Sequence, residues 1–562
     1  MKQLFVILLL CAKCGIHSIS AAEPSQKSTE DETSAIRTPK YESPAPRING
    51  PRVYGARPNR PFQYYIPVVG QRPITYGAEG LPSGLTLDKT TGIITGRVAQ
   101  AGEYPVKLTA TNAAGSASAP LKIKIGSRIS LTPPMGWNNW NNYHMGINDA
   151  NIRETAEAMI SSGLIDHGYC YINLDEGWDG TRDEKGALRM NPKKFKDPKA
   201  LGDFLHTRGL KFGIYSSPGP KACAGTIGSY EYEDIDAATY ASWGVDFLKY
   251  DWCSYEHIEV IRRAELLAKA LPDKSNELLT LAAEYKDLAW TELNMTPGKK
   301  PEDKARIKEI STQINGILAT LDKETQKKIR VTVAQEPYQR MRASLDKVDR
   351  DIVYSICQYG KEDSWEWADS IGANLVRTTP DLFAKPDRMD QYGFGRPLKI
   401  AQWQGPGHWN DPDMLQIGNG NFTTDQNYTH MTQWCMLGAP LILGNYLTKL
   451  TPFLLNVFTN DEVLAVNQDE LGLQATQVSK NGKTEVWAKP LADGGLAVAL
   501  YNRSDAPAEV AASWTDLKLN GKRMVRDLWR QKDHGPTDLE IKQTVAPFGA
   551  EMFKILPNSE KK

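Results

Sequence analysis

The pattern of hydrophobic and polar positions divides most of the chain into three parts. Between about 48 and 126, apolar and polar residues alternate, most clearly over 106–110, which predicts half-buried strands. Between about 127 and 472, short apolar runs alternate with helical segments, as they do in βα units. From about 473 to 557 the strand pattern returns. We therefore expect an α/β domain between two β domains, the last of them a small antiparallel sandwich.

In the central part, apolar runs and helical segments alternate as they do in a catalytic (β/α)8 TIM barrel. Polar residues follow each apolar run directly, and in such barrels the chemistry lies where the strands end. The clearest predicted strands are 169–174, 210–215, 245–250, 352–356 and 373–376. The region is long for one barrel, which indicates an insertion.

A charged, helix-rich stretch over about 265–345 predicts this insertion. Apolar residues recur at helical spacing on both sides of Met295–Pro301, where Pro and Gly interrupt the pattern. We expect a helical hairpin packed on the barrel. A lid, a wall of the site, an oligomer contact and a purely structural element are all open interpretations.

The first residues have the pattern of a secretory signal peptide. An apolar run over 4–10 follows Lys2 and precedes small residues at 20–22, and the run is too short for a membrane span. We expect residues 1–22 to be removed on export to the periplasm or the exterior. Residues 23–47, rich in Ser, Thr, Pro, Glu and Lys, predict a flexible linker.

Charge and composition narrow the class of partner. The chain of 562 residues has 67 Lys and Arg against 67 Asp and Glu, with no block of like charge. This balance argues against a nucleic acid or an anionic membrane as partner. Fourteen Trp and 23 Tyr suit a carbohydrate-binding site, although buried barrel aromatics give the same composition. No stretch after the signal peptide is long and apolar enough to cross a membrane.

The cysteines predict neither a metal site nor a cofactor. In the leader, Cys11 and Cys14 lack the small preceding residue of a lipoprotein, so a lipid anchor is the less favoured interpretation. The rest form no CxxC pair and the His residues are scattered, which disfavours structural zinc. An odd number remains after export, so at least one stays unpaired: Cys170, Cys223, Cys253, Cys357 and Cys435.

One strand ends in a charged cluster that suits catalysis. In residues 244–253 an apolar run leads to Lys249 and Asp251, which leave the same side of an extended chain because they lie two apart. A carboxylate at a barrel strand end is a candidate catalyst. The segment alone is equally consistent with a helix cap or an ion pair.

Seven segments in order resemble the α-galactosidases of glycoside hydrolase family 27, in clan D. The resemblance covers residues 130–556, and the module over 48–126 resembles the immunoglobulin-like (cadherin-like) modules of secreted bacterial enzymes. A single motif of this kind is weak evidence, whereas seven in the expected order are strong. The segments are Thr132–Trp140, Tyr171–Trp178, Lys211–Gly219, Leu248–Cys253, Tyr354–Gly360, Arg377–Asp381 and Trp409–Met414.

This resemblance implies a retaining mechanism with two carboxylates. Asp251 matches the family nucleophile and Asp381 the acid/base, a pair that stands about 5–5.5 Å apart in retaining glycosidases. Lys249 would keep the nucleophile ionised and bind the sugar.

Other matches imply how the sugar is held. Gln358 stands where the family varies with the substituent at C2, and it resembles the members that accept a hydroxyl there. Cys223 and Cys253 match a family disulfide beside the site. The remaining expected sugar contacts are Trp140 as an apolar face, Asp175, Lys249, Arg377 and Asp413 as hydrogen-bonding groups, and Tyr215 and Met414 as walls.

One residue departs from the family pattern. The usual Asp-Asp-Gly-Trp reads Asp175-Glu176-Gly-Trp here, and the second acid normally meets the C4 and C6 hydroxyls of galactose. Glutamate reaches one methylene further, so we expect Glu176 to crowd the hydroxymethyl group and favour β-L-arabinopyranose, which lacks it. One methylene discriminates by only about 1–3 kcal/mol, so some α-galactosidase activity should remain.

Three functions from different classes therefore stay open. The first is an exo-glycosidase acting on terminal α-galactosyl or β-L-arabinopyranosyl groups. The second is a clan relative with another glycone, such as an α-N-acetylgalactosaminidase or an α-glucan-cleaving enzyme. The third is a carbohydrate-binding protein without catalysis, against which the presence of both Asp251 and Asp381 argues.

Overall fold

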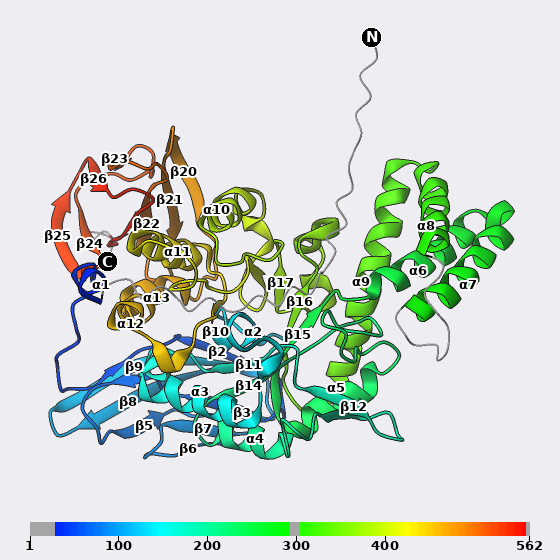
Figure 1. Cartoon of the computed structure of the whole chain (residues 1–562). Coiled ribbons are helices and arrows are strands. Elements are labelled where there is room, and N and C mark those ends of the chain that lie inside the picture. The colour runs from blue at the N-terminus through cyan, green and yellow to red at the C-terminus, as the bar shows by residue number, and fades with distance from the viewer. Residues whose placement is uncertain (1–28, 293–303, 558–562) are drawn as a thin grey trace, which may run out of the picture.

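The computed structural model describes residues 29–292 and 304–557, which form three domains (Figure 1). The predicted signal peptide over 1–22 lies outside these ranges. Within them, no helix combines the length and the apolar character that crossing a membrane requires.

The central domain is the expected parallel barrel. Each strand pairs in parallel with its neighbours, and a bridge between Leu415 and Leu443 links the two ends of the sheet. The strands are short and almost wholly buried, which explains their apolar sequences. In spatial order they are β18 (Trp409–Asp411), β17 (Leu375–Arg377), β16 (Val353–Cys357), β15 (Val245–Asp251), β14 (Lys211–Ser216), β11 (Tyr171–Leu174), β10 (Met135–Asn138) and β19 (Leu441–Leu443).

Helices between the strands set where each strand begins. Gly244, at φ 84°, ends α5 (Glu233–Trp243) in the left-handed conformation that glycine adopts easily, and β15 starts at the next residue. The other helices that follow barrel strands include α2 (Trp140–Tyr143), α3 (Asp149–Ser161), α4 (Pro198–His206), α6 (Tyr255–Ala270), α9 (Lys323–Lys347), α10 (Pro386–Asp390), α11 (Thr424–Leu437), α12 (Pro452–Phe458) and α13 (Asp461–Asn467).

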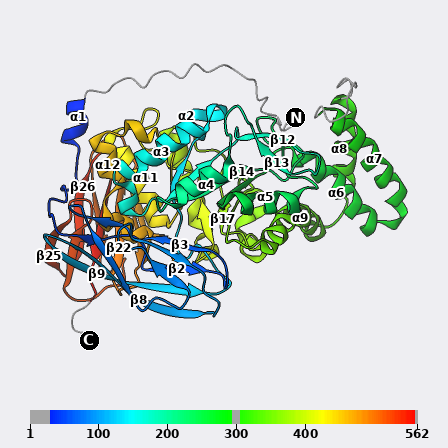
Figure 2. The ribbon, with the colours of Figure 1, turned by 90° about the horizontal axis from the view of Figure 1, so that it is seen from below.

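The insertion is a helical hairpin, as expected, but it packs on outward extensions of barrel helices. The helices α7 (Ser275–Glu292) and α8 (Lys304–Ala319) share an apolar cluster with α6 and α9. In both views this four-helix unit projects from the side of the barrel, away from the N-terminal domain (Figures 1 and 2). The predicted break at Met295–Pro301 lies outside the described residues.

The N-terminal β module closes the bottom of the barrel. Its three sheets enclose a core of their own that runs from Ile48 to Ile125. The largest has β2 (Val53–Ala56), β9 (Gly115–Ile125), β8 (Gly102–Asn112) and β5 (Thr75–Glu79), the second has β3 (Phe62–Tyr65), β7 (Ile93–Gly96) and β6 (Leu85–Leu87), and the smallest pairs β1 (Arg47–Ile48) with β4 (Val68–Val69).

Polar contacts join the module to the barrel. Arg57 Nε donates to Asp351 Oδ1 at 2.6 Å, just before β16. Lys211 Nζ, at the start of β14, donates to the Tyr54 hydroxyl at 2.5 Å. The module therefore meets the starts of the barrel strands, at the end opposite to the strand-end motifs.

The C-terminal domain is the expected antiparallel sandwich. One sheet has six strands, and β23 (Ala508–Ser513) pairs with β26 (Glu540–Val545) across a common core. The six are β20 (Thr476–Asn481), β21 (Thr484–Pro490), β22 (Leu496–Asn502), β27 (Ala550–Ile555), β24 (Arg523–Asp527) and β25 (Lys532–Thr537).

The expectation of a flexible linker over 23–47 is wrong for its described part. Residues Thr29–Ser34 form the helix α1, which contacts α12 of the barrel domain. Arg37 donates to the carbonyl of Ala550 at 2.8 Å and to Asp425 at 2.6 Å. A polar composition suited a linker, but the hydrogen bonds to Asp425 of α11 and Ala550 of β27 hold the segment against the folded domains.

Candidate active site

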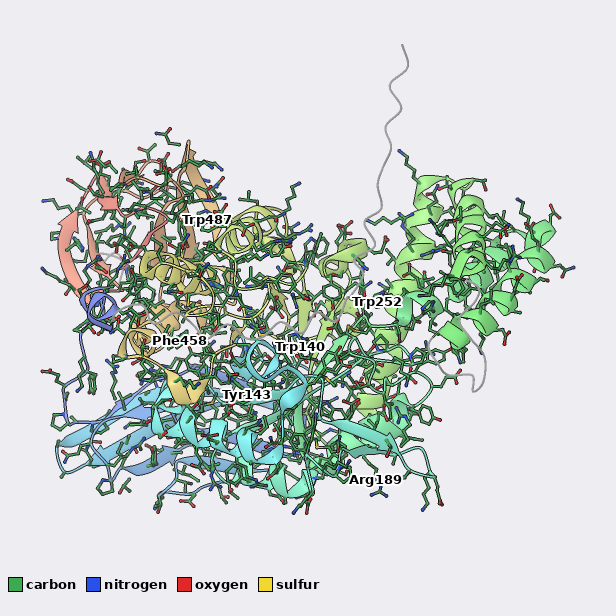
Figure 3. All side chains as sticks on the ribbon, in the orientation of Figure 1. Trp140, Tyr143, Arg189, Trp252, Phe458 and Trp487 are labelled. Carbon is green, nitrogen blue, oxygen red and sulfur yellow. A yellow bond between two sulfur atoms is a disulfide. The ribbon has the colours of Figure 1, made fainter. Side chains whose placement is uncertain are left out.

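The carboxyl ends of the barrel strands bring the predicted site residues together. Figure 3 shows Trp140 and Trp252 on the upper side of the barrel, whereas the N-terminal strands lie on the lower side. Asp251 is the last residue of β15 and is only 5% exposed. Asp381 follows β17 and its side chain is 51% exposed. One carboxylate is thus enclosed, and the other is open to solvent.

Two donors hold the Asp251 carboxylate. The Tyr359 hydroxyl donates to Oδ1 at 2.6 Å, and the Trp252 amide donates to the same oxygen at 2.8 Å. Burial raises the pKa of Asp251, whereas Lys249 and these two hydrogen bonds oppose the rise and the charge of Asp381 adds to it. The two carboxylates are therefore close enough to sense each other's charge.

Lys249 lies between two acids. Its Nζ donates to Asp175 Oδ2 at 2.8 Å, and Asn138 donates to the same oxygen, also at 2.8 Å. Burial alone would lower the pKa of Lys249, but Asp175 and Asp251 outweigh it and raise the pKa above its ordinary value. Lys249 is consequently a positive charge beside the candidate nucleophile.

Arg377 forms ion pairs with two further acids of the site, Asp381 and Asp413. Its Nη2 donates to Asp381 Oδ1 at 2.8 Å and to Asp413 Oδ2 at 2.6 Å. Burial raises the pKa of Asp413 to about 6, with Arg377 opposing the rise and Asp381 and Asp411 adding to it. Asp413 has a left-handed φ of 93°, an uncommon conformation for a residue with a side chain, and such strained positions are often found at functional sites.

Glu176 makes contacts that the sequence did not predict. It is 1% exposed, and its carboxylate accepts from the Ala224 amide at 2.7 Å, the Thr226 hydroxyl at 2.6 Å and the Thr226 amide at 3.3 Å. Both oxygens are thus engaged by one loop. Burial raises the pKa of Tyr215, and the charges of Asp251, Asp175 and Glu176 add to the rise.

The other predicted sugar contacts have defined partners. Gln358 is buried, and its Oε1 accepts from the Tyr338 hydroxyl at 2.9 Å. Met414, beside Asp413, lines a pocket with Lys249 and Arg377. Trp140 is half-buried and packs edge-on against His144, with ring centroids 5.4 Å apart.

The predicted disulfide is formed beside the nucleophile. Cys223 and Cys253 are bonded, and the Tyr215 hydroxyl lies 3.2 Å from Cys253 Sγ. Across 29–292 and 304–557, only Cys223, Asp251 and Cys253 place enough candidate ligand atoms together to hold a metal ion. Since the two sulfurs bond each other, this group lacks the free thiolates that a metal would need.

Several site residues escaped the sequence analysis. Tyr359 donates to the nucleophile, Asn138 orients Asp175, Tyr338 orients Gln358, and Thr226 binds Glu176. Asn138 ends β10 and Tyr359 follows β16, and both belong to segments that resemble the family, so their positions were a usable signal. Tyr338 comes from α9, and no local pattern linked it to the site.

The fold and this cluster define the chain as a barrel glycoside hydrolase, and comparisons with known proteins agree. The family model described as "Alpha galactosidase A" matches residues 132–297 and 320–469. A second family model, described as "Alpha galactosidase C-terminal beta sandwich domain", matches residues 481–555. A third, described as "Putative Ig domain", matches residues 45–126. The chain belongs to the α-galactosidase family, glycoside hydrolase family 27, and is an exo-glycosidase of that family.

Individual relatives give the same result. Alpha-galactosidase 2 of Arabidopsis thaliana is 33% identical over 439 residues, which span 77% of this chain and 92% of the relative. A Bacteroides fragilis crystal structure described as a "putative alpha-galactosidase/melibiase" is 32% identical, with a TM-score of 0.75 over 93% of this chain and 100% of the other. A Geobacillus stearothermophilus β-L-arabinopyranosidase shares the fold, with 23% identity and a TM-score of 0.57 over 77% of this chain and 98% of the other.

Proposed function

We propose that the enzyme releases non-reducing terminal α-D-galactosyl residues by double displacement, with Asp251 as nucleophile and Asp381 as acid/base. The observation that carries this proposal is the contrast between the two carboxylates. Asp251 is enclosed and held by Tyr359 beside the charge of Lys249, whereas Asp381 is half exposed. A nucleophile needs a fixed position, and an acid/base must reach both the leaving oxygen and water.

The proposed reaction has two steps. Asp251 attacks the anomeric carbon and forms a glycosyl-enzyme ester, while Asp381 gives its proton to the departing glycosidic oxygen. Asp381 then takes a proton from water, and the resulting hydroxide equivalent displaces Asp251 from the same carbon. Two inversions give net retention. The Arg377 contact holds the Asp381 carboxylate on the side of Asp413 throughout this cycle.

The glycone is proposed from the polar groups that line the pocket. Asp175 and Lys249, already paired at 2.8 Å, would bind hydroxyls on one side of the ring. Arg377 and Asp413 would bind those on the other side. Gln358, held by Tyr338, supports a hydroxyl at C2, because an N-acetyl group needs more space than a fixed buried amide leaves. This favours galactose over N-acetylgalactosamine.

A β-L-arabinopyranoside is the second candidate substrate, because the sequence has Glu176 where the family usually has aspartate. From the sequence alone, the longer side chain is expected to crowd the hydroxymethyl group of galactose. In the structure the carboxylate binds the loop at Ala224 and Thr226. The extra methylene therefore extends the carboxylate towards this loop and not towards the hydroxymethyl group. This supports galactose as the main glycone, with the pentose also accepted.

We also propose that the enzyme is exported. The pattern over residues 1–22 supports this, and so does the disulfide between Cys223 and Cys253, since disulfides persist in oxidising compartments.

The test of the proposed function is the wild-type kcat/KM on nitrophenyl α-D-galactoside, β-L-arabinopyranoside, α-N-acetylgalactosaminide and α-D-glucoside. We expect turnover of the first two, with the galactoside preferred. Preference for either of the last two would replace the proposed glycone. An enzyme inert on all four would support a binding protein without catalysis.

A further inference from the structure

We infer that Thr226 is a positioning residue that lets the site accept a hexose, because its side chain holds Glu176 against the loop and out of the space of the hydroxymethyl group. This inference rests on the proposed function and concerns the same sugar pocket. Glu176 is already in the family motif, whereas Thr226 stands fifty residues further on, outside every segment that carries the resemblance.

The contacts of Glu176 are strongest at Thr226. The hydroxyl donates to Oε1 at 2.6 Å, whereas the backbone amide of the same residue is 3.3 Å from that oxygen. Oε2 has its own donor, the Ala224 amide at 2.7 Å. Removing the hydroxyl therefore leaves Oε1 with one long hydrogen bond in a buried place, which costs free energy unless the carboxylate turns to another donor.

Hydrogen bonds and a disulfide hold the loop that carries Thr226 in place. Its backbone closes on itself, with the Ala222 amide donating to the Thr226 carbonyl at 3.0 Å. Cys223 is bonded to Cys253, two residues beyond the nucleophile. Ser254 Oγ accepts from the Lys221 amide at 2.9 Å and donates to its carbonyl at 2.7 Å. Glu176 is thus tied to a segment that is itself fixed to the end of β15.

A second acid restricts where Glu176 can go. Asp179 Oδ2 accepts from the Ile227 amide at 3.0 Å on the same loop. Burial raises the pKa of Glu176, and the charge of Asp179 adds to the rise, while the loop hydrogen bonds oppose it. Without the Thr226 hydroxyl, repulsion by Asp179 favours movement of the carboxylate away from the loop. Tyr215, the expected wall of the pocket, lies close enough for its pKa, raised mainly by burial, to be raised further by the charge of Glu176.

This geometry predicts a glycone-specific effect. A released Glu176 enters the space that galactose needs for its hydroxymethyl group, whereas β-L-arabinopyranose has no atom there. Discrimination of this kind between similar substrates amounts to about tenfold. The effect should fall on kcat/KM for the galactoside and should largely spare the pentoside.

The experiment compares Thr226→Val, which keeps the shape without the hydroxyl, with Thr226→Ser, which keeps the hydroxyl. We expect Thr226→Val to lower the ratio of galactoside to arabinopyranoside kcat/KM about tenfold, and Thr226→Ser to retain the wild-type ratio within about twofold. The same Val substitution in a Glu176→Asp background should leave the ratio unchanged, because the shorter acid does not reach Thr226.

Three outcomes would overturn the inference. They are an equal loss on both glycosides in Thr226→Val, a failure of Thr226→Ser to retain the ratio, and an equal effect of Val in both backgrounds. Since wild-type turnover is measured first, inactivity of the wild type on both glycosides would instead reject the proposed function. Circular dichroism and thermal unfolding of each variant would show whether the barrel is intact.

Discussion

The Tyr359 hydroxyl lies 2.6 Å from Oδ1 of Asp251, so a side chain from the loop after β16 supports the carboxylate at the end of β15. Asp251 pairs with Cys357 across the two strands, and this register places Tyr359 two residues beyond that pair. Tyr359 has a left-handed φ of 57°, and Gly360 follows at 74°. The turn directs the phenol towards the nucleophile.

This relationship gives a prediction for the Tyr359→Phe variant. The hydrogen bond stabilises the ionised form of Asp251 and opposes the rise in its pKa. Its loss should raise that pKa further, so the acidic limb of the kcat/KM profile should move to higher pH. We expect kcat at the pH optimum to fall roughly tenfold, in line with the loss of one charge-assisted hydrogen bond. The pH profile on nitrophenyl α-D-galactoside measures both effects.

The matched control for this experiment is Tyr104→Phe in the N-terminal module, whose hydroxyl donates to the Gln100 carbonyl. It should leave the profile unchanged. An unmoved acidic limb in Tyr359→Phe would contradict the proposed coupling between this phenol and the nucleophile.

Reduction of the site disulfide should lower both stability and activity. The double variant Cys223→Ser, Cys253→Ser frees a loop that binds Glu176 and borders Tyr215. Native disulfides contribute about 2–5 kcal/mol to the free energy of unfolding, so urea unfolding should show a loss in this range. We expect KM for the galactoside to rise, because the loop no longer holds the sugar-facing groups.

For comparison, Cys170→Ser alters a thiol that is not part of this disulfide and lies at the start of β11, at the other end of the barrel. It should leave KM unchanged. Equal KM values for the disulfide variant and the wild type would show that the disulfide is not needed to hold the loop for substrate binding.

A second specificity prediction concerns Glu176→Asp. The shorter side chain gives up the contacts with Ala224 and Thr226 and restores the acid that the family usually has at this position. The ratio of galactoside to β-L-arabinopyranoside kcat/KM should therefore rise, by up to about tenfold. An unchanged or lower ratio would remove Glu176 from the selection of the glycone.

The base of the barrel allows a test of stability that is separate from catalysis. Arg57 and Asp351 join the module to the barrel, and their side chains are 18% and 15% exposed. Arg57→Ala removes the charged partner of the partly buried Asp351 carboxylate, which keeps only the hydrogen bond from the backbone amide of residue 57. This loss should lower the free energy of unfolding by about 1–3 kcal/mol. Activity should be unchanged, because the contact lies at the far end of the barrel.

The matched control is Arg97→Ala, whose pair with Asp349 is 48% and 66% exposed. Exposed pairs contribute about 0–1 kcal/mol, so this variant should unfold almost as the wild type does. If both variants lost the same free energy in chemical unfolding, burial would not explain the strength of the interface.

The sequence predicted the barrel and the strand-end acids because both depend on local patterns. An apolar run that ends in Lys249-Tyr-Asp251 is visible in one segment. The role of Tyr359 depends on the register between β15 and β16, and the contact of Glu176 with Thr226 depends on how a distant loop folds. Composition was misleading for residues 29–47, since partners such as Ala550 are distant in sequence.

The central claim is that Asp251 forms the covalent intermediate. An activated fluorinated α-galactoside slows hydrolysis of the glycosyl-enzyme, so that the sugar stays attached and can be located by mass spectrometry of peptides. We predict one sugar per enzyme, on the peptide that contains Asp251, with activity lost in parallel. A sugar attached to any other residue, or inactivation without attachment, would contradict the account.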